Sequence, residues 1–432
     1  MAQPDAAGEK TGGYGLLALL ALMNVLNFVD RQLLSSFANY IMPDLGLTNT
    51  EFGLLTGLVF ILFYAVAGLF MGGLADLVNR PRLIATAMVV WSALTAASGL
   101  AKNFITLAIP RVFIGVGESA LTPTALSLLA DRFPPSKLGF ATGAYYMGVP
   151  VGVGVSLLVA GVLGEAIGWR NCFFLLGALG VAFSLIIYQV KDPRTSAAHT
   201  EHAPRPKLGE LVSTFFTALR GSGALQLTML AGILVHLVLG AAAFDQVWLV
   251  KERGFERGEI AIISGVVATI AGVVGNLFGG LASDRWMRKP GRTRAMFMVW
   301  MLLALLPVNL CYRLAPAGNP LFWIGICVAY FQLGAFYGPT FSAVQELCPA
   351  KVRSTVVAFY LMVLNVVGLG LGITLSGVVM DQLIARGVDQ PYSWTLFVFT
   401  CLSGLAIPCY AAAAMAVRRA QGAVGKTATA AA

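Results

Sequence analysis

Long apolar segments recur along the whole chain, separated by short polar connections. About 20 consecutive apolar residues suffice for an α-helix to cross the hydrocarbon core of a bilayer, and twelve such segments can be marked in the sequence. The pattern therefore predicts an all-α, polytopic membrane protein with 12 transmembrane helices. The predicted spans are 14–40, 50–77, 82–101, 104–130, 138–165, 169–190, 223–250, 258–283, 294–314, 319–347, 352–384 and 391–417.

A polar stretch at 191–222, which contains three prolines, interrupts this pattern. It predicts a cytoplasmic linker between two six-helix bundles, at 14–190 and 223–417. The two ends, 1–13 and 418–432, are rich in small or polar residues and are predicted to be disordered.

The composition excludes a soluble protein and gives no sign of a catalyst. Hydrophobic residues make up 58% of the 432 residues and charged residues 11%, with a mean hydropathy of +0.79, whereas soluble domains have about 25% charged residues. None of the six cysteines forms a C-x-x-C pair, so we expect no metal site and no disulfide framework. No nucleophile–histidine pairing stands out, so we expect neither an enzyme nor a bound cofactor.

The net charge of +9 reflects where the basic residues lie. An even number of spans places both termini on one side, and 20 of the 29 Lys and Arg residues fall on that side against 7 on the other. The positive-inside rule then predicts that both termini are cytoplasmic, in a cell membrane such as a bacterial inner membrane. We therefore expect membrane lipids, and no nucleic acid, as partners of the basic residues.

The two predicted bundles repeat each other. Segment 72–76 begins with glycine, ends with aspartate and recurs 208 residues later at 280–284. Three glycines within 152–161 recur 216 residues later within 368–377. Internal repeats in membrane proteins indicate a pseudo-symmetric transporter with its site between the repeats. The alternative is a non-transporting sensor built on a carrier scaffold.

Four motifs resemble signatures of the major facilitator superfamily, and the resemblance extends over essentially the whole chain. The resemblance implies a twelve-helix carrier that works by alternating access. Asn79 departs from the first motif, because the family usually has glycine there. The motifs are Gly72-x-x-x-Asp76-x-x-x-Arg80-x-Arg82, its second copy Gly280-x-x-x-Asp284-Arg285, Arg111-x-x-x-Gly115-x-Gly117, and Gly148-x-Pro150-x-Gly152.

In this family, charges at the cytoplasmic helix ends stabilise a gate. We expect the same here, because both halves repeat an arrangement of acids and bases; the alternative is plain topology-setting charge. The predicted gate residues are Asp76, Arg80, Arg82, Asp131, Asp284, Arg285 and Glu346.

Four ionisable residues interrupt predicted spans: Asp30, Arg31, Arg111 and Glu118. A charge at the centre of a spanning helix costs roughly 2.5–3.5 kcal/mol. Such residues usually face a water-filled cavity, where they bind substrate or move protons. Arg111 and Glu118 are seven residues apart and so lie on nearly the same helix face, whereas the adjacent Asp30 and Arg31 point about 100° apart.

We predict that Asp30 accepts the coupling proton while its carboxylate competes for Arg31 or Arg111, with Glu118 as the second proton-binding candidate. Both arginines and Glu118 are predicted to bind substrate, since arginine suits phosphate and carboxylate groups. His236, 206 residues after Asp30, is expected to face the same cavity from the second bundle. The alternative is a permanent ion-pair network.

Small residues in the fifth span predict close helix packing and a kink. Glycine permits close approach between spanning helices, and proline removes a backbone hydrogen bond. The predicted helix-packing residues are Gly148, Pro150, Gly152 and Gly154.

The segment Asn27-Phe28-Val29-Asp30-Arg31, together with Arg111 and Gly117-Glu118-Ser119, resembles the spinster branch. That resemblance implies a carrier of lysophospholipids or sphingosine phosphates. We therefore expect a monomeric, proton-coupled secondary transporter of a small amphipathic anion. The alternatives are multidrug efflux and transport of organic acids such as sugar acids.

Overall fold

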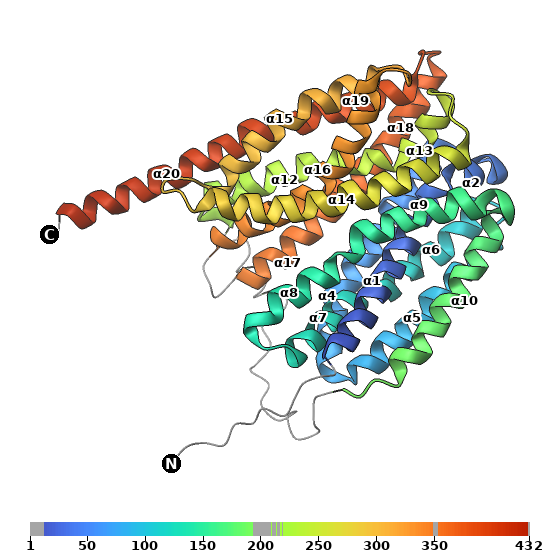
Figure 1. Ribbon diagram of the computed structural model, residues 1–432, viewed down its shortest axis with the longest axis horizontal. Helices are drawn as coiled ribbons and strands as arrows, with labels where there is room; N and C mark the ends of the chain where they lie inside the picture. Colours follow the sequence, from blue (N-terminus) through green and yellow to red (C-terminus); the bar gives the residue numbers. More distant parts are fainter. Residues whose placement is uncertain are drawn as a thin grey trace.

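The computed structural model describes residues 13–192, 219–348 and 353–430, together with positions 209, 213 and 217. Every regular element in these residues is a helix, and Figure 1 shows two groups of helices side by side. The first group consists of α1 (Gly13–Ser36), α2 (Ala38–Leu45), α3 (Asn49–Thr56), α4 (Leu58–Leu77), α5 (Arg80–Ser98), α6 (Phe104–Glu118), α7 (Leu121–Arg132), α8 (Pro135–Tyr146), α9 (Gly148–Ala166) and α10 (Gly168–Tyr188).

The second group repeats this plan after the linker, most of which lies outside the described residues. It consists of α12 (Gly223–Ala241), η2 (Ala242–Phe244), α13 (Asp245–Lys251), α14 (Arg257–Met287), α15 (Arg294–Leu314), α16 (Pro320–Glu346), α17 (Arg353–Val363), the π-helical segment η4 (Leu364–Gly370), α18 (Leu371–Ala385), α19 (Pro391–Gly404) and α20 (Ala406–Ala430).

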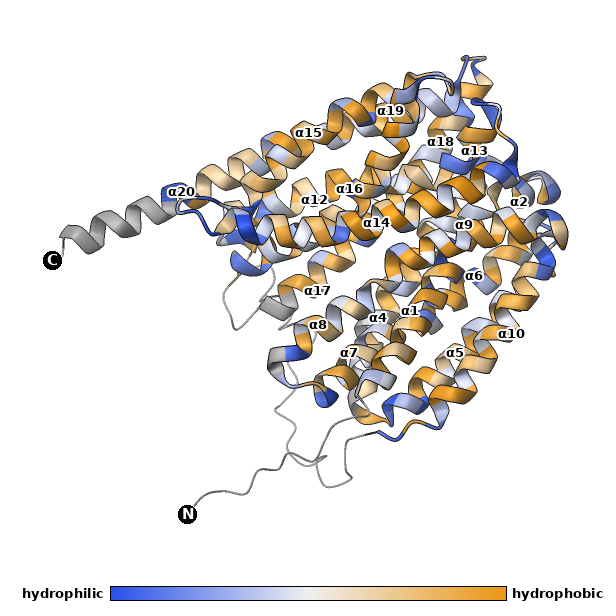
Figure 2. Ribbon diagram, viewed as in Figure 1, coloured by the Kyte–Doolittle hydropathy of each residue, from blue (hydrophilic) through white to orange (hydrophobic). Residues whose placement is uncertain are grey.

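Eleven stretches of the described chain are long and apolar enough to cross a membrane, one fewer than predicted. The remaining predicted span, 82–101, is helical as α5 but is less apolar than the other eleven, because its first turn carries Arg80 and Arg82. Residues along the helices are mostly hydrophobic, and hydrophilic residues gather near the helix ends (Figure 2). The chain is therefore an all-α, multi-pass membrane protein.

The expectation of a disordered tail does not hold for the residues that the structure describes. Helix α20 continues through Ala430, well past the predicted boundary at 418. Alanine is the strongest helix former, and the alanine-rich tail extends the last span as a helix (Figure 1). Residues 1–12 and 431–432 lie outside the described part of the chain.

Several spans are broken where small residues occur. The fourth span breaks at Ser119 and Ala120, directly after Glu118, and the fifth breaks at Met147. The matching place in the eleventh span, 216 residues later, is the π-helical segment η4. Such irregular turns are frequent at functional sites.

Helix α9 joins the two groups, packing against α1 on one side and α14 on the other. A Cβ atom at Gly154 would lie 2.7 Å from the carbonyl oxygen of Gly265 on α14, so only glycine permits this approach. On the other side of α9, Gly148 and Gly152 lie against Asn24 and Phe28 of α1.

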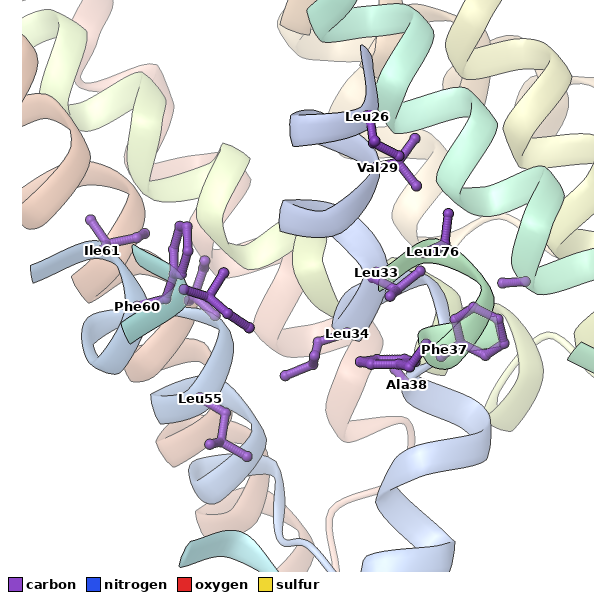
Figure 3. Close-up of a cluster of buried hydrophobic side chains, with 14 of the residues drawn as sticks. Leu26, Val29, Leu33, Leu34, Phe37, Ala38, Leu55, Phe60, Ile61 and Leu176 are labelled. Atoms are coloured by element: carbon purple, nitrogen blue, oxygen red, sulfur yellow. The ribbon is translucent and has the colours of Figure 1, made fainter. Parts of the chain in front are cut away.

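A large apolar cluster fills the first group around α1 and extends into the second. Leu26, Val29 and Leu33 project from α1, Phe37 follows directly after it, and Phe60 of α4 faces them across the cluster (Figure 3). All five side chains are buried. This packing fixes the rotation of α1 about its axis, and with it the directions of Asp30 and Arg31.

The glycine contact between α9 and α14 predicts a specific sensitivity. Replacing Gly154 by leucine should destabilise the protein by about 1–3 kcal/mol or more, because the side chain has no space. The apparent melting temperature in detergent, followed by fluorescence size exclusion, should fall by several degrees. Gly139→Leu is the control, since nothing lies within 4 Å of a Cβ atom there; an equal loss in both variants would contradict the prediction.

Candidate functional site

Arg31 of α1 and Glu118 of α6 form an ion pair inside the first helix group. The Arg31 Nη2 and Glu118 Oε2 atoms are 3.3 Å apart, and Nε donates to the same oxygen at 3.3 Å. The Glu118 side chain is fully buried, whereas 21% of the Arg31 side chain is exposed. Arg31 is therefore the member of the pair that a solute can reach.

Arg111 lies beside this pair but is held differently. Its Nη2 donates to the carbonyl oxygen of Arg31 at 2.8 Å, and its Nη1 donates to that of Asp30 at 3.5 Å. Neutral backbone acceptors hold the guanidinium without cancelling its charge. Arg111 is 2% exposed, so it provides a fixed positive charge next to Arg31.

Asp30 points away from Arg31 and is 3% exposed. It faces the polar groups of Trp91 and Thr95 on α5, and its Oδ1 has no hydrogen-bond partner within the described part of the chain. We expected this carboxylate to compete for an arginine; instead, Glu118 holds Arg31, and Arg111 bonds the backbone. The reason is the 100° turn between adjacent helical residues, which directs Asp30 into the seam with α5 and Arg31 toward α4 and α6.

Aromatic rings surround the two guanidinium groups. The Cζ atom of Arg31 lies 4.2 Å from the ring centre of Tyr64 and 4.9 Å from that of Phe28, and Arg111 lies 4.5 Å from Phe60. Rings at this distance attract a cation through their π-electrons and leave its edge open to other ligands. The site thus combines positive charge with apolar walls, as an anion with an apolar portion requires.

His236 of α12 lies in the second helix group, packed against aromatic rings of α16. Its ring centre is 4.8 Å from that of Phe336 and 5.4 Å from that of Tyr337, and it is 1% exposed. The ring contacts of His236 are therefore with residues of its own helix group.

Among the predicted gate residues, Arg80 is the centre of a cluster at the end of the bundle that holds both chain termini, here called the terminal end. Its Nη2 lies 2.6 Å from Asp131 and 2.5 Å from Asp192, and its Nη1 donates to Ser127 at 3.0 Å. The Cζ atom of Arg82 lies 5.6 Å from the ring centre of Tyr188. The side chain of Asp76 lies outside the described residues.

The second helix group builds the matching cluster around Arg294, which was not predicted. Arg294 lies 2.8 Å from Asp284 and 2.6 Å from Glu346. The expected partner, Arg285, is exposed and forms no ion pair with a described residue. The repeat could have revealed Arg294, because it follows Arg80 by 214 residues and each begins a helix after a capping side chain, Asn79 or Thr293.

A further buried ion pair was also missed. Asp245 and Arg313 are 2.7 Å apart and line an internal cavity with Asn309, Tyr330 and Gln332. Arg313 lies near the end of the predicted span 294–314, and the structure buries it in the last turn of α15. The cavity lies wholly in the second helix group, away from the Arg31 site.

Comparison with known proteins agrees with this architecture. The Major Facilitator Superfamily matches residues 20–373. A hexuronate transporter of Bacillus subtilis is 27% identical over 384 residues, 85% of this chain and 88% of the relative. An MFS-type efflux pump of Mycolicibacterium smegmatis is 26% identical over 370 residues, 86% of this chain and 85% of the relative.

Among solved structures, the crystal structure of a bacterial homologue of the human lysosomal transporter Spinster, inward-facing and unoccupied, has a TM-score of 0.80. It is 24% identical and covers 95% of this chain and 98% of its own. The likeness shows a shared fold, and it agrees with the resemblance to the spinster branch seen in the sequence.

The unequal surroundings of Arg294 and Arg285 predict unequal effects of their replacement. Arg294→Ala leaves two carboxylates without their shared cation and should lower transport at least about tenfold, whereas a change at an exposed residue is usually within about 0.5 kcal/mol. Arg285→Ala is the matched control. Initial rates of transport in proteoliposomes, normalised to incorporated protein, measure both. Equal rates in the two variants would contradict the assignment.

Proposed function

Because the chain belongs to the Major Facilitator Superfamily and is a membrane transporter, we propose that it carries an amphipathic anion such as a lysophospholipid by alternating access, coupled to protons. The observation that carries this proposal is the site between α1 and α6. There, Arg31 is partly accessible, Arg111 holds an uncancelled positive charge, and aromatic rings supply apolar surface. We further propose a cell-membrane location with both termini in the cytoplasm.

Glu118 and a substrate anion compete for the same cation in this mechanism. Arginine stays protonated throughout, so the state of the site depends on which anion holds Arg31. A proton on Glu118 weakens its hold, and the headgroup of the substrate then takes its place with two parallel hydrogen bonds. Release of the proton restores the Arg31–Glu118 pair and expels the anion. The movement of the proton is thereby coupled to the movement of the substrate.

Asp30 is the other proton site in this mechanism, and coupling requires its proton as well as that of Glu118. Its Oδ1 lacks a hydrogen-bond partner within the described chain, and a buried acceptor without a partner gains from a proton or a water molecule. Asp30 precedes Arg31 directly, and its carbonyl oxygen accepts from Arg111. A change in its charge therefore acts on both arginines without a direct ion pair.

A second candidate substrate is a sugar acid, which the hexuronate-transporting relative suggests. A carboxylate would use the same arginines, whereas a cationic drug would meet two positive charges. The apolar walls around Arg31 favour the amphipathic anion over the sugar acid, since a polyol gains little from burial against aromatic rings.

The proposal predicts that Asp30→Asn abolishes the stimulation of lysophospholipid uptake by a proton gradient directed into the vesicles. The asparagine keeps the size of the side chain but cannot take up and release the proton. Radiolabelled lysophospholipid uptake into proteoliposomes, with and without the gradient, measures the effect. Asp389→Asn is the control, because Asp389 is exposed in a loop.

Substrate class is decided in the same assay by competition. Unlabelled lysophospholipid should compete, while hexuronate and a cationic dye should not. Competition by hexuronate alone would favour the sugar-acid carrier, and gradient-stimulated flux that persists in Asp30→Asn would remove Asp30 from the coupling mechanism.

A further inference from the structure

Asp381 of α18 reaches from the second helix group to the first, at the end of the bundle opposite the chain termini, here called the distal end. Its carboxylate accepts four hydrogen bonds from the start of α3. Two come from the backbone N–H groups of Asn49 and Thr50, at 3.2 and 2.7 Å, and two from their side chains, at 2.7 and 2.6 Å. A carboxylate in this position also interacts favourably with the helix dipole of α3.

Small residues bring α3 and α18 close enough for this contact. A Cβ at Gly377 would lie within 2.8 Å of the carbonyl carbon of Asn49, and a Cβ at Gly53 would lie 3.0 Å from the carbonyl oxygen of Ile373. Tyr392 donates to the amide oxygen of Asn49 at 2.8 Å. The two helices therefore meet backbone to backbone, and the Asp381 carboxylate lies at the edge of a close-packed seam.

The internal repeat supplies a counterpart to Asp381. The 216-residue offset that relates the glycines of α9 and α18 also relates Glu165 to Asp381, and the 208-residue offset relates Asn49 to Arg257. Glu165 lies in the last turn of α9, 3.9 Å from Arg257, the first residue of α14. Each acid thus lies in the last two turns of a helix in one half and contacts the start of a helix in the other.

We propose that Asp381 and Glu165 form two repeat-related latches that close the distal end, and that the Asp381 latch dominates. The contacts differ in kind. Asp381 accepts four hydrogen bonds, whereas the Glu165 and Arg257 side chains are 56% and 47% exposed and form one loose pair. Exposed pairs of this sort contribute little, while hydrogen bonds to a charged group contribute more.

This inference rests on alternating access, which follows from family membership, and not on the proposed substrate or proton coupling. Opening the distal end requires α3 to leave α18, and the Asp381 carboxylate must then exchange its four donors for water. The latch therefore sets how often the distal end opens when no substrate is bound.

Distances between spin labels on opposite halves test the proposal. The labels are attached at Lys102→Cys and Arg386→Cys, two exposed distal-end positions, in a chain whose six native cysteines are replaced. Asp381→Asn should raise the ratio of open to closed distal ends at least about tenfold, as the loss of hydrogen bonds to a charged group implies. Glu165→Gln should raise it less than about threefold, and the control Asp389→Asn should not change it.

Thr50→Val is a milder variant that removes only the side-chain donor of Thr50. It keeps the proposal testable if Asp381→Asn fails to fold. It should raise the open population between about twofold and tenfold. An unchanged distance distribution in both Asp381→Asn and Thr50→Val overturns the latch. An effect of Glu165→Gln equal to or larger than that of Asp381→Asn overturns the dominance of Asp381. Neither result depends on lysophospholipid flux.

Discussion

The ion pair between Arg31 and Glu118 is the constraint on which the rest of the site depends. Neither charge can face lipid without a cost of roughly 2.5–3.5 kcal/mol, so α1 and α6 must lie together. The same requirement orients Arg111, whose guanidinium uses the carbonyl oxygens of residues 30 and 31. The pair agrees with the rotation of α1 that the apolar cluster fixes, and it places Arg31 beside the aromatic ring of Tyr64 on α4. Glu118 is the one carboxylate paired with Arg31 among the described residues, so another anion can replace it. A permanent network of several ion pairs would not allow this exchange.

The two ends of the bundle are held by different kinds of contact. At the terminal end, Arg80 and Arg294 each join two carboxylates, and each cluster lies within one helix group. At the distal end, Asp381, Glu165 and the amide of Asn39, which donates to Gln246, join the two groups to each other. The terminal clusters therefore keep each group rigid, while the distal contacts determine whether the groups separate. Two groups that move as rigid bodies require both kinds of contact. A contact within one group is unchanged when the groups separate, so only contacts between the groups affect their separation.

The sequence was sufficient for the helices and for the identity of the central charges, because apolar length and the rarity of ionisable residues in spans carry that information. It was not sufficient for the pairing. Helical geometry predicts that Asp30 and Arg31 point apart, but which carboxylate meets Arg31 depends on how α4, α5 and α6 surround α1. Arg285 was favoured because it follows Asp284 directly, whereas the repeat points to Arg294. Arg313 lies near the end of a predicted span, where the sequence does not show whether a side chain is buried or exposed. The alanine-rich tail resembled a disordered end, although its helix propensity extends α20.

The repeat preserves backbone contacts more faithfully than it preserves chemistry. Glycines recur at matching places in α9 and in η4 and α18, and both helices pack closely against the opposite group. The charges do not recur: Asp30, Arg31, Arg111 and Glu118 all belong to the first group, and 206 residues after Asp30 the second group has His236 against Phe336 and Tyr337. One half therefore supplies the buried charges of the candidate site, and the other supplies aromatic surface around His236. The amphipathic anion proposed above would meet both kinds of surface only when the halves are close, so its binding would favour the movement that closes the site around it.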